Sequence, residues 1–247
     1  MRKILYILYQ PYKWGFFLPF MFLNTLLFGA MAVLISVFIN QKAGSYWGGA
    51  VWSRLNSFLT PMRVKVYGKE NINKNTSYVI ISNHQSHYDI FVIYGWLGLD
   101  IKWVMKQELR RIPGLGIGSE KVGHIFIDRS NNKVASESLK KAIKNLAKGS
   151  SVAIFAEGTR SKTGELGIFK RGAFKMALNA GLPILPITVI GTKDILPSNT
   201  FDVFPGKAKL FIHQPIDIKK YSETEINKLM TDVREIISIP LTKELKV

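Results

Sequence analysis

Two kinds of hydrophobic pattern alternate along the chain after about residue 60. Short apolar runs rich in β-branched residues predict buried strands at 64–67, 78–82, 103–106, 124–127, 152–155, 184–190 and 208–212. Longer segments with apolar faces or wholly apolar composition predict helices at 88–97, 133–148, 172–179 and 223–239. Because strands and helices alternate, we expect an α/β fold in which helices flank a mostly parallel sheet.

The first sixty residues show a different pattern. No charged residue occurs in 14–39, a stretch long enough to cross a bilayer, which needs roughly 20 apolar residues. A weaker amphipathic stretch follows at 46–59, and its aromatic residues suit a membrane interface. We therefore expect residues 1–60 to be membrane-anchoring helices and residues 61–247 to form the α/β domain. The alternative is a buried core helix, which the apolar character of every face of 14–39 disfavours.

Composition and charge narrow the classes of partner. The formal net charge is +17, and the first acidic residue in the chain is Glu70. Strong basicity indicates acidic partners such as anionic lipid, an acidic carrier protein or nucleic acid, although a lysine-rich surface is the simpler alternative. No aromatic-interleaved basic stripe is present, so we expect no nucleic-acid partner. The chain has no cysteine and its four histidines are scattered, so we expect neither a metal nor a cofactor.

His84 and Asp89 lie five residues apart, directly after the predicted strand 78–82. Residues five apart on one helix point in different directions, so this pair can meet only across a bend. We place His84 at the strand end and Asp89 in the first turn of the next helix, with Ser86 or His87 near the N-cap. Asp89 would then accept the Nδ1 proton of His84 and leave Nε2 as an acceptor. The alternative is an ordinary cap and turn in which these polar side chains serve only the backbone.

Two other predicted strands end in charged residues. Arg129 follows the strand 124–127, and an arginine there can hold a phosphate through two parallel N–H bonds. Glu157 and Arg160 follow the strand 152–155 and flank a glycine that permits a tight turn. A surface arginine and a solvated ion pair are the alternatives. Ligands of parallel α/β sheets bind beyond the carboxyl ends of the strands, so we expect these clusters to lie together.

These motifs resemble those of the glycerolipid acyltransferases, specifically the lysophosphatidic acid acyltransferase group. The resemblance covers about residues 78–190 and consists of four blocks in the family's order, together with a linking stretch. The matching residues are His84 and Asp89; Gly123, Phe126 and Arg129; Glu157, Gly158, Thr159 and Arg160; the proline block 182–187; and Lys106, Glu108, Leu109 and Pro113 in the linking stretch.

The resemblance implies an acyltransferase that moves a fatty acyl chain from a thioester donor to the free sn-2 hydroxyl of 1-acylglycerol 3-phosphate. His84 would act as general base with Asp89 orienting it, and no acyl-enzyme is required. Arg129, Arg160 and Lys106 would bind the phosphate, and Gly158 and Thr159 belong to the same binding block. We expect Glu157 to orient Arg160, or alternatively to bind a hydroxyl of the substrate.

Some choices stay open at this level. The donor is either acyl-CoA or acyl-carrier protein, and related enzymes use glycerol 3-phosphate or other lysophospholipids as acceptors. A basic peripheral protein that binds anionic lipid without catalysis is the alternative from a different class. For location, we expect the cytoplasmic face of the cell membrane, held by the N-terminal segment. Basic residues flank that segment on both sides, so a one-leaflet anchor is favoured over a transmembrane helix.

Overall fold

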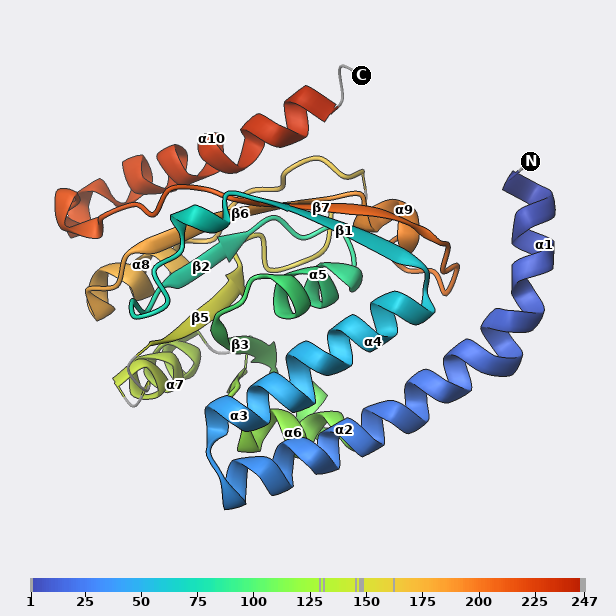
Figure 1. The fold of residues 1–247 in the computed structure, drawn as a ribbon. Helices are drawn as coiled ribbons and strands as arrows, with labels where there is room; N and C mark the ends of the chain where they lie inside the picture. Colours follow the sequence, from blue (N-terminus) through green and yellow to red (C-terminus); the bar gives the residue numbers. More distant parts are fainter. Residues whose placement is uncertain are drawn as a thin grey trace.

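The computed structural model of the chain describes residues 2–128, 130, 132–144, 146, 149–161 and 163–244. Its centre is a seven-stranded sheet with the strand order β1-β7-β6-β2-β5-β3-β4 (Figure 1). Only the β6–β7 pair is antiparallel. The strands are β1 (Met62–Tyr67), β2 (Val79–Ser82), β3 (Asp100–Lys106), β4 (Ile125–Ile127), β5 (Ser150–Phe155), β6 (Ile184–Ile190) and β7 (Gly206–Ile212). The expected mostly parallel α/β sheet is confirmed.

Helices cover both faces of the sheet and create two hydrophobic cores. On one face, α5 (Tyr88–Trp96) and α4 (Trp52–Leu59) pack against a core that includes Phe91, Ile93 and Leu185. On the other face, a second core includes residues of α7 (Asn132–Lys144), α8 (Arg171–Ala180) and α10 (Ile226–Glu244). The central strands β2 and β6 contribute to both cores because alternate side chains of a strand point to opposite faces.

The N-terminal segment forms a helical hairpin beside the α/β domain (Figure 1). Its first arm runs through α1 (Arg2–Tyr12), the π-helical segment η1 (Lys13–Phe17) and α2 (Leu18–Phe38). The chain turns at Asn40, whose side chain accepts the Ala43 N–H and caps the second arm. That arm consists of α3 (Gln41–Ser45), the π-helical segment η2 (Tyr46–Val51) and α4.

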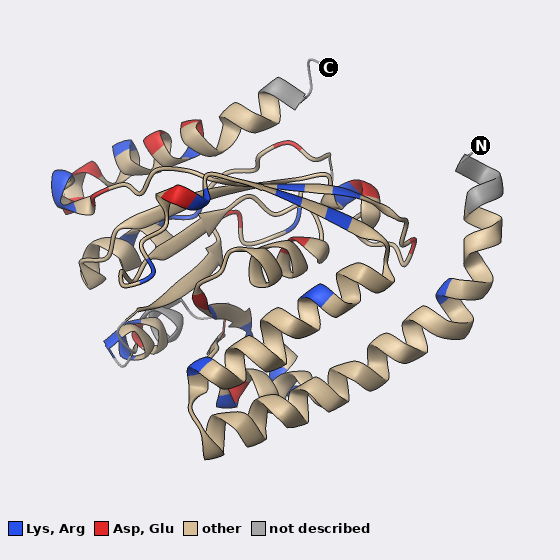
Figure 2. Ribbon diagram, viewed as in Figure 1, with Lys and Arg blue, Asp and Glu red and all other residues tan. Residues whose placement is uncertain are grey.

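The first arm is unusually apolar on its outer surface. In the described part of the chain, 6–38 is the one helical segment long and apolar enough to cross a membrane. Large apolar side chains such as Phe22, Leu27 and Phe38 are more than half exposed, and Figure 2 shows no charged residue along α2. Exposed apolar surface of this extent is compatible with association with a membrane.

Glycines allow the first arm to pack closely against α6 (Leu115–Lys121), a short helix that the hydrophobic pattern does not predict. A Cβ atom on Gly29 would lie 2.4 Å from the carbonyl oxygen of Gly114, and Gly118 also contacts Gly29. The helix α2 therefore lies directly over α6, and the two form one wall of the molecule's main cavity.

Among the described residues, most predicted element boundaries lie within two residues of those in the structure, and the larger differences are in α10 and β3. Helix α7 extends to Lys144, and residues 145, 147 and 148 of its predicted continuation lie outside the described residues. Helix α10 begins at Ile226 after a single 3-10 turn and continues past Pro240 to Glu244. Strand β3 begins at Asp100, because pairing with β5 extends it before the run that the sequence predicts.

Candidate active site

The carboxyl ends of β2, β5, β3 and β4 lie next to one another, because these four parallel strands are consecutive in the sheet. This arrangement brings together three groups of residues that the sequence predicts at strand ends. They are the His84–Asp89 segment after β2, the Glu157–Arg160 turn after β5, and Lys106 at the end of β3. Arg129 follows β4 in the sequence but lies outside the described residues.

His84 and Asp89 meet across the turn between β2 and α5. The Nδ1 atom of His84 lies 2.8 Å from Oδ2 of Asp89, which is fully buried in the first turn of α5. The same oxygen accepts the backbone N–H groups of Gln85 at 2.7 Å and Ser86 at 2.9 Å. An ionised Asp89 accepts only, so His84 Nδ1 carries the hydrogen and Nε2 is left with a lone pair.

Asp89 thus takes part in both arrangements that the sequence allows, the pairing with His84 and the capping of the turn. Asp89 holds the histidine and also satisfies backbone groups of the turn. Of the two residues expected near the N-cap, Ser86 and His87, the N-cap is His87, and its side chain makes no capping hydrogen bond. Ser86 instead accepts the Tyr88 N–H at 3.2 Å. The ring of His84 stacks on Phe155 at 3.8 Å between centroids, which fixes the plane of the imidazole.

Glu157 contacts the backbone and does not orient Arg160. One carboxylate oxygen accepts the His84 N–H at 2.8 Å, and the other accepts the Gly167 N–H at 2.8 Å. No hydrogen bond or ion pair joins Glu157 to Arg160, although both residues are described, so the expected pairing is wrong. Burial raises the pKa of Glu157, while the two N–H bonds oppose that shift. The residue joins the β5 turn to the His84 backbone, a link strengthened by a 2.7 Å bond from Ser161 N–H to the His84 carbonyl.

The turn after β5 places its cation at the mouth of a cavity. Gly158 adopts a φ of +73°, a conformation that favours glycine, and a Cβ there would meet the side chain of Lys170. Thr159 and Arg160 both line the cavity. Among described residues, the Arg160 side chain has neither a hydrogen-bond nor an ion-pair partner, so its guanidinium remains available to an anion.

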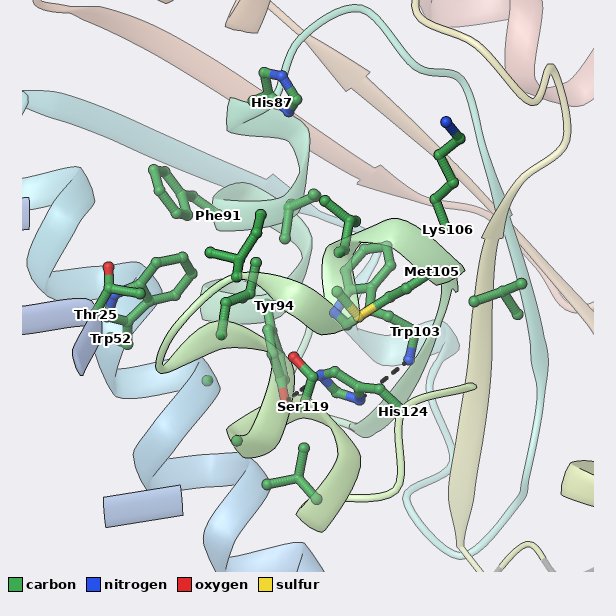
Figure 3. Close-up of a pocket in the computed structure, with 18 of the residues that line it drawn as sticks. Thr25, Trp52, His87, Phe91, Tyr94, Trp103, Met105, Lys106, Ser119 and His124 are labelled. Atoms are coloured by element: carbon green, nitrogen blue, oxygen red, sulfur yellow. Dashed lines mark hydrogen bonds between the residues drawn. The ribbon is translucent and has the colours of Figure 1, made fainter. Parts of the chain in front are cut away.

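Lys106 lies at the same mouth but, unlike Arg160, forms an ion pair. Its ammonium group lies 2.8 Å from the carboxylate of Glu108, and both side chains are more than half exposed. Figure 3 shows Lys106 and His87 at one end of the group of lining residues, with Tyr94, Ser119 and His124 toward the other end. Lys106 and His87 are exposed, whereas Tyr94 and Ser119 are buried. Partial burial lowers the pKa of His87, and the nearby charges of Arg160 and His84 lower it further. The mouth is thus basic, but His87 adds little positive charge to it.

Behind this mouth lies an apolar cavity of about 630 Å³. Its walls come from the N-terminal hairpin as well as the α/β domain, and they are mostly hydrocarbon and aromatic. They include Phe28, Gly29, Gly49, Trp52, Phe91, Trp103, Met105 and Leu115. The sequence gives no sign that the two predicted domains share a cavity. In the described residues, no group of three or more His, Asp or Glu side chains could hold a metal ion.

A half-buried histidine lies at the far end of the cavity. His124 accepts the Trp103 backbone N–H on Nδ1, and its Nε2 faces the Tyr94 hydroxyl at 3.4 Å (Figure 3). Burial lowers the pKa of His124 to about 3, with a further contribution from Lys102. The imidazole is therefore neutral at ordinary pH and adds no charge to the cavity.

Sequence reasoning missed the third segment that surrounds the His84–Asp89 pair. Thr192, the first residue of α9 (Thr192–Ile195), donates its hydroxyl to Oδ1 of Asp89. Ser198 donates to the Gln85 and Ser161 carbonyls at 3.1 Å each. The only signal in the sequence is that Gly191 and Thr192 directly follow the predicted strand 184–190. In the structure that strand, β6, is parallel to β2 and antiparallel to β7.

The structure thus places a histidine–carboxylate pair at the strand ends of a mostly parallel α/β sheet, beside an apolar cavity with a cationic mouth. The model of the acyltransferase family matches residues 63–190. The chain therefore belongs to the acyltransferase family.

Individual relatives agree with this assignment. The chain is 32% identical over 184 residues to the 1-acyl-sn-glycerol-3-phosphate acyltransferase of Borreliella burgdorferi, covering 74% of each protein. It is 36% identical over 156 residues to a chloroplastic 1-acyl-sn-glycerol-3-phosphate acyltransferase of Arabidopsis thaliana, covering 62% of this chain and 44% of the relative. The chain thus spans less than half the length of that plant protein.

A solved structure resembles the whole chain. It is the crystal structure of the 1-acyl-sn-glycerophosphate acyltransferase PlsC from Thermotoga maritima, which is 27% identical in sequence. The TM-score is 0.81, and the alignment covers 100% of this chain and 98% of the other. The likeness therefore includes the N-terminal hairpin, which lies before the residues that the family model matches.

Proposed function

We propose that the protein transfers a fatty acyl chain from a thioester donor to the sn-2 hydroxyl of 1-acylglycerol 3-phosphate, giving phosphatidic acid. The observation that carries the proposal is the His84–Asp89 pair, which lies beside an apolar cavity whose mouth contains Arg160 and Lys106. The cavity suits hydrocarbon chains, and the cations suit a phosphate. The names of the relatives support this choice of acceptor.

In this proposal His84 is the general base. Its Nε2 takes the proton of the sn-2 hydroxyl as that oxygen forms a bond to the thioester carbonyl carbon. The carbon–sulfur bond then breaks, and the proton on Nε2 passes to the departing thiolate. Asp89 stabilises the imidazolium through the Nδ1 hydrogen bond, so transfer is direct and the protein carries no acyl group.

The phosphate of the acceptor binds at the mouth. Arg160 supplies a planar pair of N–H groups with no competing partner among the described residues, and Lys106 supplies a second charge that must leave Glu108. Arg129 remains a predicted third cation on sequence grounds. Glu157 contributes indirectly, because it fixes the backbone of His84.

The hairpin anchors the enzyme to one leaflet at the cytoplasmic face of the cell membrane. The open end of the hairpin is fixed beside the α/β domain: Tyr12 of the first arm donates to the Leu59 carbonyl of the second arm at 2.7 Å, and Lys13 contacts Asp202 of the α/β domain at 3.7 Å. A hairpin of this kind keeps its basic flanks at one anionic surface, where each cation contributes about 1 kcal/mol. The acceptor lipid then enters the cavity from the membrane, and the donor arrives from the cytosol.

A thioester-release assay on the purified protein in detergent tests the proposal. We expect release of CoA from acyl-CoA, or of holo-carrier from acyl-carrier protein, when 1-acylglycerol 3-phosphate is present. Glycerol 3-phosphate and lysophosphatidylcholine should give rates at least about tenfold lower. The first lacks the acyl chain, and the second carries a cationic choline phosphodiester in place of the phosphate monoester. Absence of release with every acceptor would contradict the proposal and favour a lipid-binding protein without catalysis.

A further inference from the structure

The second oxygen of Asp89 has a partner that lies 103 residues away in the chain. Oδ2 is surrounded by His84 Nδ1 and two backbone N–H groups. Oδ1 accepts one side-chain hydrogen bond, from the hydroxyl of Thr192. Asp89 and Thr192 are both fully buried, so this contact is shielded from solvent.

The position of Thr192 is fixed from both sides along the chain. Gly191 precedes it with a φ of +89°, and a Cβ at Gly191 would lie 2.2 Å from the Lys207 carbonyl oxygen of the neighbouring strand. After it, the Leu196 carbonyl accepts the Ser86 hydroxyl at 2.7 Å. The 192–198 segment is therefore attached both to the sheet and to the turn that carries His84.

We propose that Thr192 is a positioning residue for the acyl-transfer reaction, whose hydroxyl locks the Asp89 carboxylate in the plane that presents Oδ2 to His84. A carboxylate can rotate about its Cβ–Cγ bond, and donors on both oxygens prevent that rotation. This role rests on the proposed function of His84 as general base. Thr192 acts through Asp89 and touches neither substrate.

The loss of this hydroxyl has an electrostatic consequence of defined sign. The Thr192 hydrogen bond disperses part of the negative charge of Asp89. Without it, more of that charge faces the imidazole and stabilises its protonated form. The acidic limb of kcat/KM against pH should then move to higher pH, by about half a unit or more.

Three variants separate positioning from packing. Thr192→Val keeps the shape and removes the hydroxyl, whereas Thr192→Ser keeps the hydroxyl. Thr188→Val is the matched control, because Thr188 is a fully buried threonine on the adjacent strand whose hydroxyl bonds to the Ile237 carbonyl and His213, away from Asp89. All three are compared by kcat, KM, pH profile and thermal unfolding.

A further readout reports on His84 directly and does not depend on activity. In protein with ¹⁵N-labelled histidine, the four imidazoles can be titrated by NMR, and His84→Ala identifies the signal of His84. We expect Thr192→Val to move the His84 titration midpoint upward and to lower kcat about tenfold with little change in KM. Thr192→Ser should stay within about twofold of wild type, and Thr188→Val should leave the His84 midpoint unchanged.

The possible outcomes test the positioning role of Thr192 separately from the proposed function. An unchanged His84 midpoint in a folded Thr192→Val protein overturns the positioning role, as does an equal shift in Thr188→Val. If the midpoint moves but the wild-type protein shows no acyl transfer, the positioning contact stands and the proposed function fails. If Thr192→Val does not fold, Thr192→Ser decides: loss of activity there with an unchanged His84 midpoint contradicts the proposal.

Discussion

At the scale of single residues, hydrogen bonds between segments far apart in sequence build the site. His84 and Asp89 lie within one turn, yet each is held from elsewhere: His84 by Glu157 and Asp89 by Thr192. The charge-assisted bonds of buried carboxylates are worth more than exposed ion pairs, because water does not compete for them. Substitution of Glu157 or Thr192 should therefore disturb the geometry of the His84–Asp89 pair more than it weakens substrate binding.

Arg160 gives a residue-scale prediction about binding. Arg160→Ala should raise KM for 1-acylglycerol 3-phosphate at least about tenfold, because a charge-assisted contact contributes about 1.5–3 kcal/mol. KM for the acyl donor should change much less. Steady-state kinetics with each substrate varied in turn provides the measurement, and Arg171→Ala, on the exposed start of α8, is the control. Equal changes for both substrates would assign Arg160 a structural or donor-binding role.

His213 gives a second residue-scale prediction, about pH and stability. Burial lowers the pKa of His213 from 6.5 to about 4. The unfolded chain therefore binds the proton first, and stability is lost as the pH falls from about 6.5 towards 4. Because the side chain is partly exposed, we expect a loss of only about 1 kcal/mol between about pH 7 and pH 5.

Thermal unfolding at both pH values tests this effect of His213. His213→Gln should lose less stability on acidification than wild type. The loss should not disappear, because the pKa of His124 is also lowered, to about 3. Parallel pH dependences for wild type and His213→Gln would show that His213 does not contribute.

At the scale of elements, the close contact of α2 with α6 closes the cavity. Gly29→Ala should destabilise the protein by about 1–3 kcal/mol, since its Cβ meets backbone atoms that cannot rotate away. It should also weaken acyl transfer, because α2 and α6 both line the cavity. Gly172→Ala in α8 is the matched control, because no atom lies within 4 Å of its added Cβ.

Differential scanning fluorimetry and the thioester-release assay measure the two effects of the Gly29 substitution. Gly172→Ala should keep or slightly raise the melting temperature, because alanine favours a helix more than glycine does. If Gly29→Ala matches Gly172→Ala in both assays, neither stability nor acyl transfer depends on the close contact between α2 and α6.

Elements with a strong pattern were predictable, and those without one were not. The run of β-branched residues in β6 predicts its bounds correctly, because a buried strand needs such residues on both faces. Helix α6 has no apolar period and contains two glycines, so only its packing on α2 makes it helical. Helix α9 has four residues, too few for any period to show.

The site was predictable where its residues follow strands. His84, Arg160 and Lys106 all reach the cavity as expected. The partners of Glu157 were not predictable, because its nearest charge in sequence is Arg160, whereas the fold brings it to a backbone group 73 residues earlier. Likewise, Thr192 depends on β6 lying beside β2, an adjacency that the sequence does not specify.

At the scale of the whole molecule, the apolar hairpin and the basic α/β domain together line the cavity beside His84. The net charge of +17 favours an anionic surface, and the outer face of α2 favours its hydrocarbon boundary. In the proposed one-leaflet anchor, the cavity mouth would lie at the interface, where the phosphate of a lysolipid lies.

The topology of the anchor can be tested in intact cells. The natural chain has no cysteine, so Lys3→Cys introduces a single label site. An impermeant thiol reagent should label it only after lysis if the hairpin stays in the cytoplasmic leaflet. A cysteine at Lys219, on the α/β domain, is the cytoplasmic control. Labelling of Lys3→Cys from outside intact cells would show that the helix spans the membrane.

The central claim is that His84 acts as the base for direct acyl transfer, and the rate of phosphatidic acid formation by His84→Ala tests it most directly. We predict less than about 1% of the wild-type rate with normal folding, because general-base help contributes about 10²–10⁴-fold. Asp89→Asn should keep more activity, since an amide oxygen can still accept the bonds that orient His84. A folded His84→Ala protein that retains more than about 5% of the wild-type rate would contradict the account.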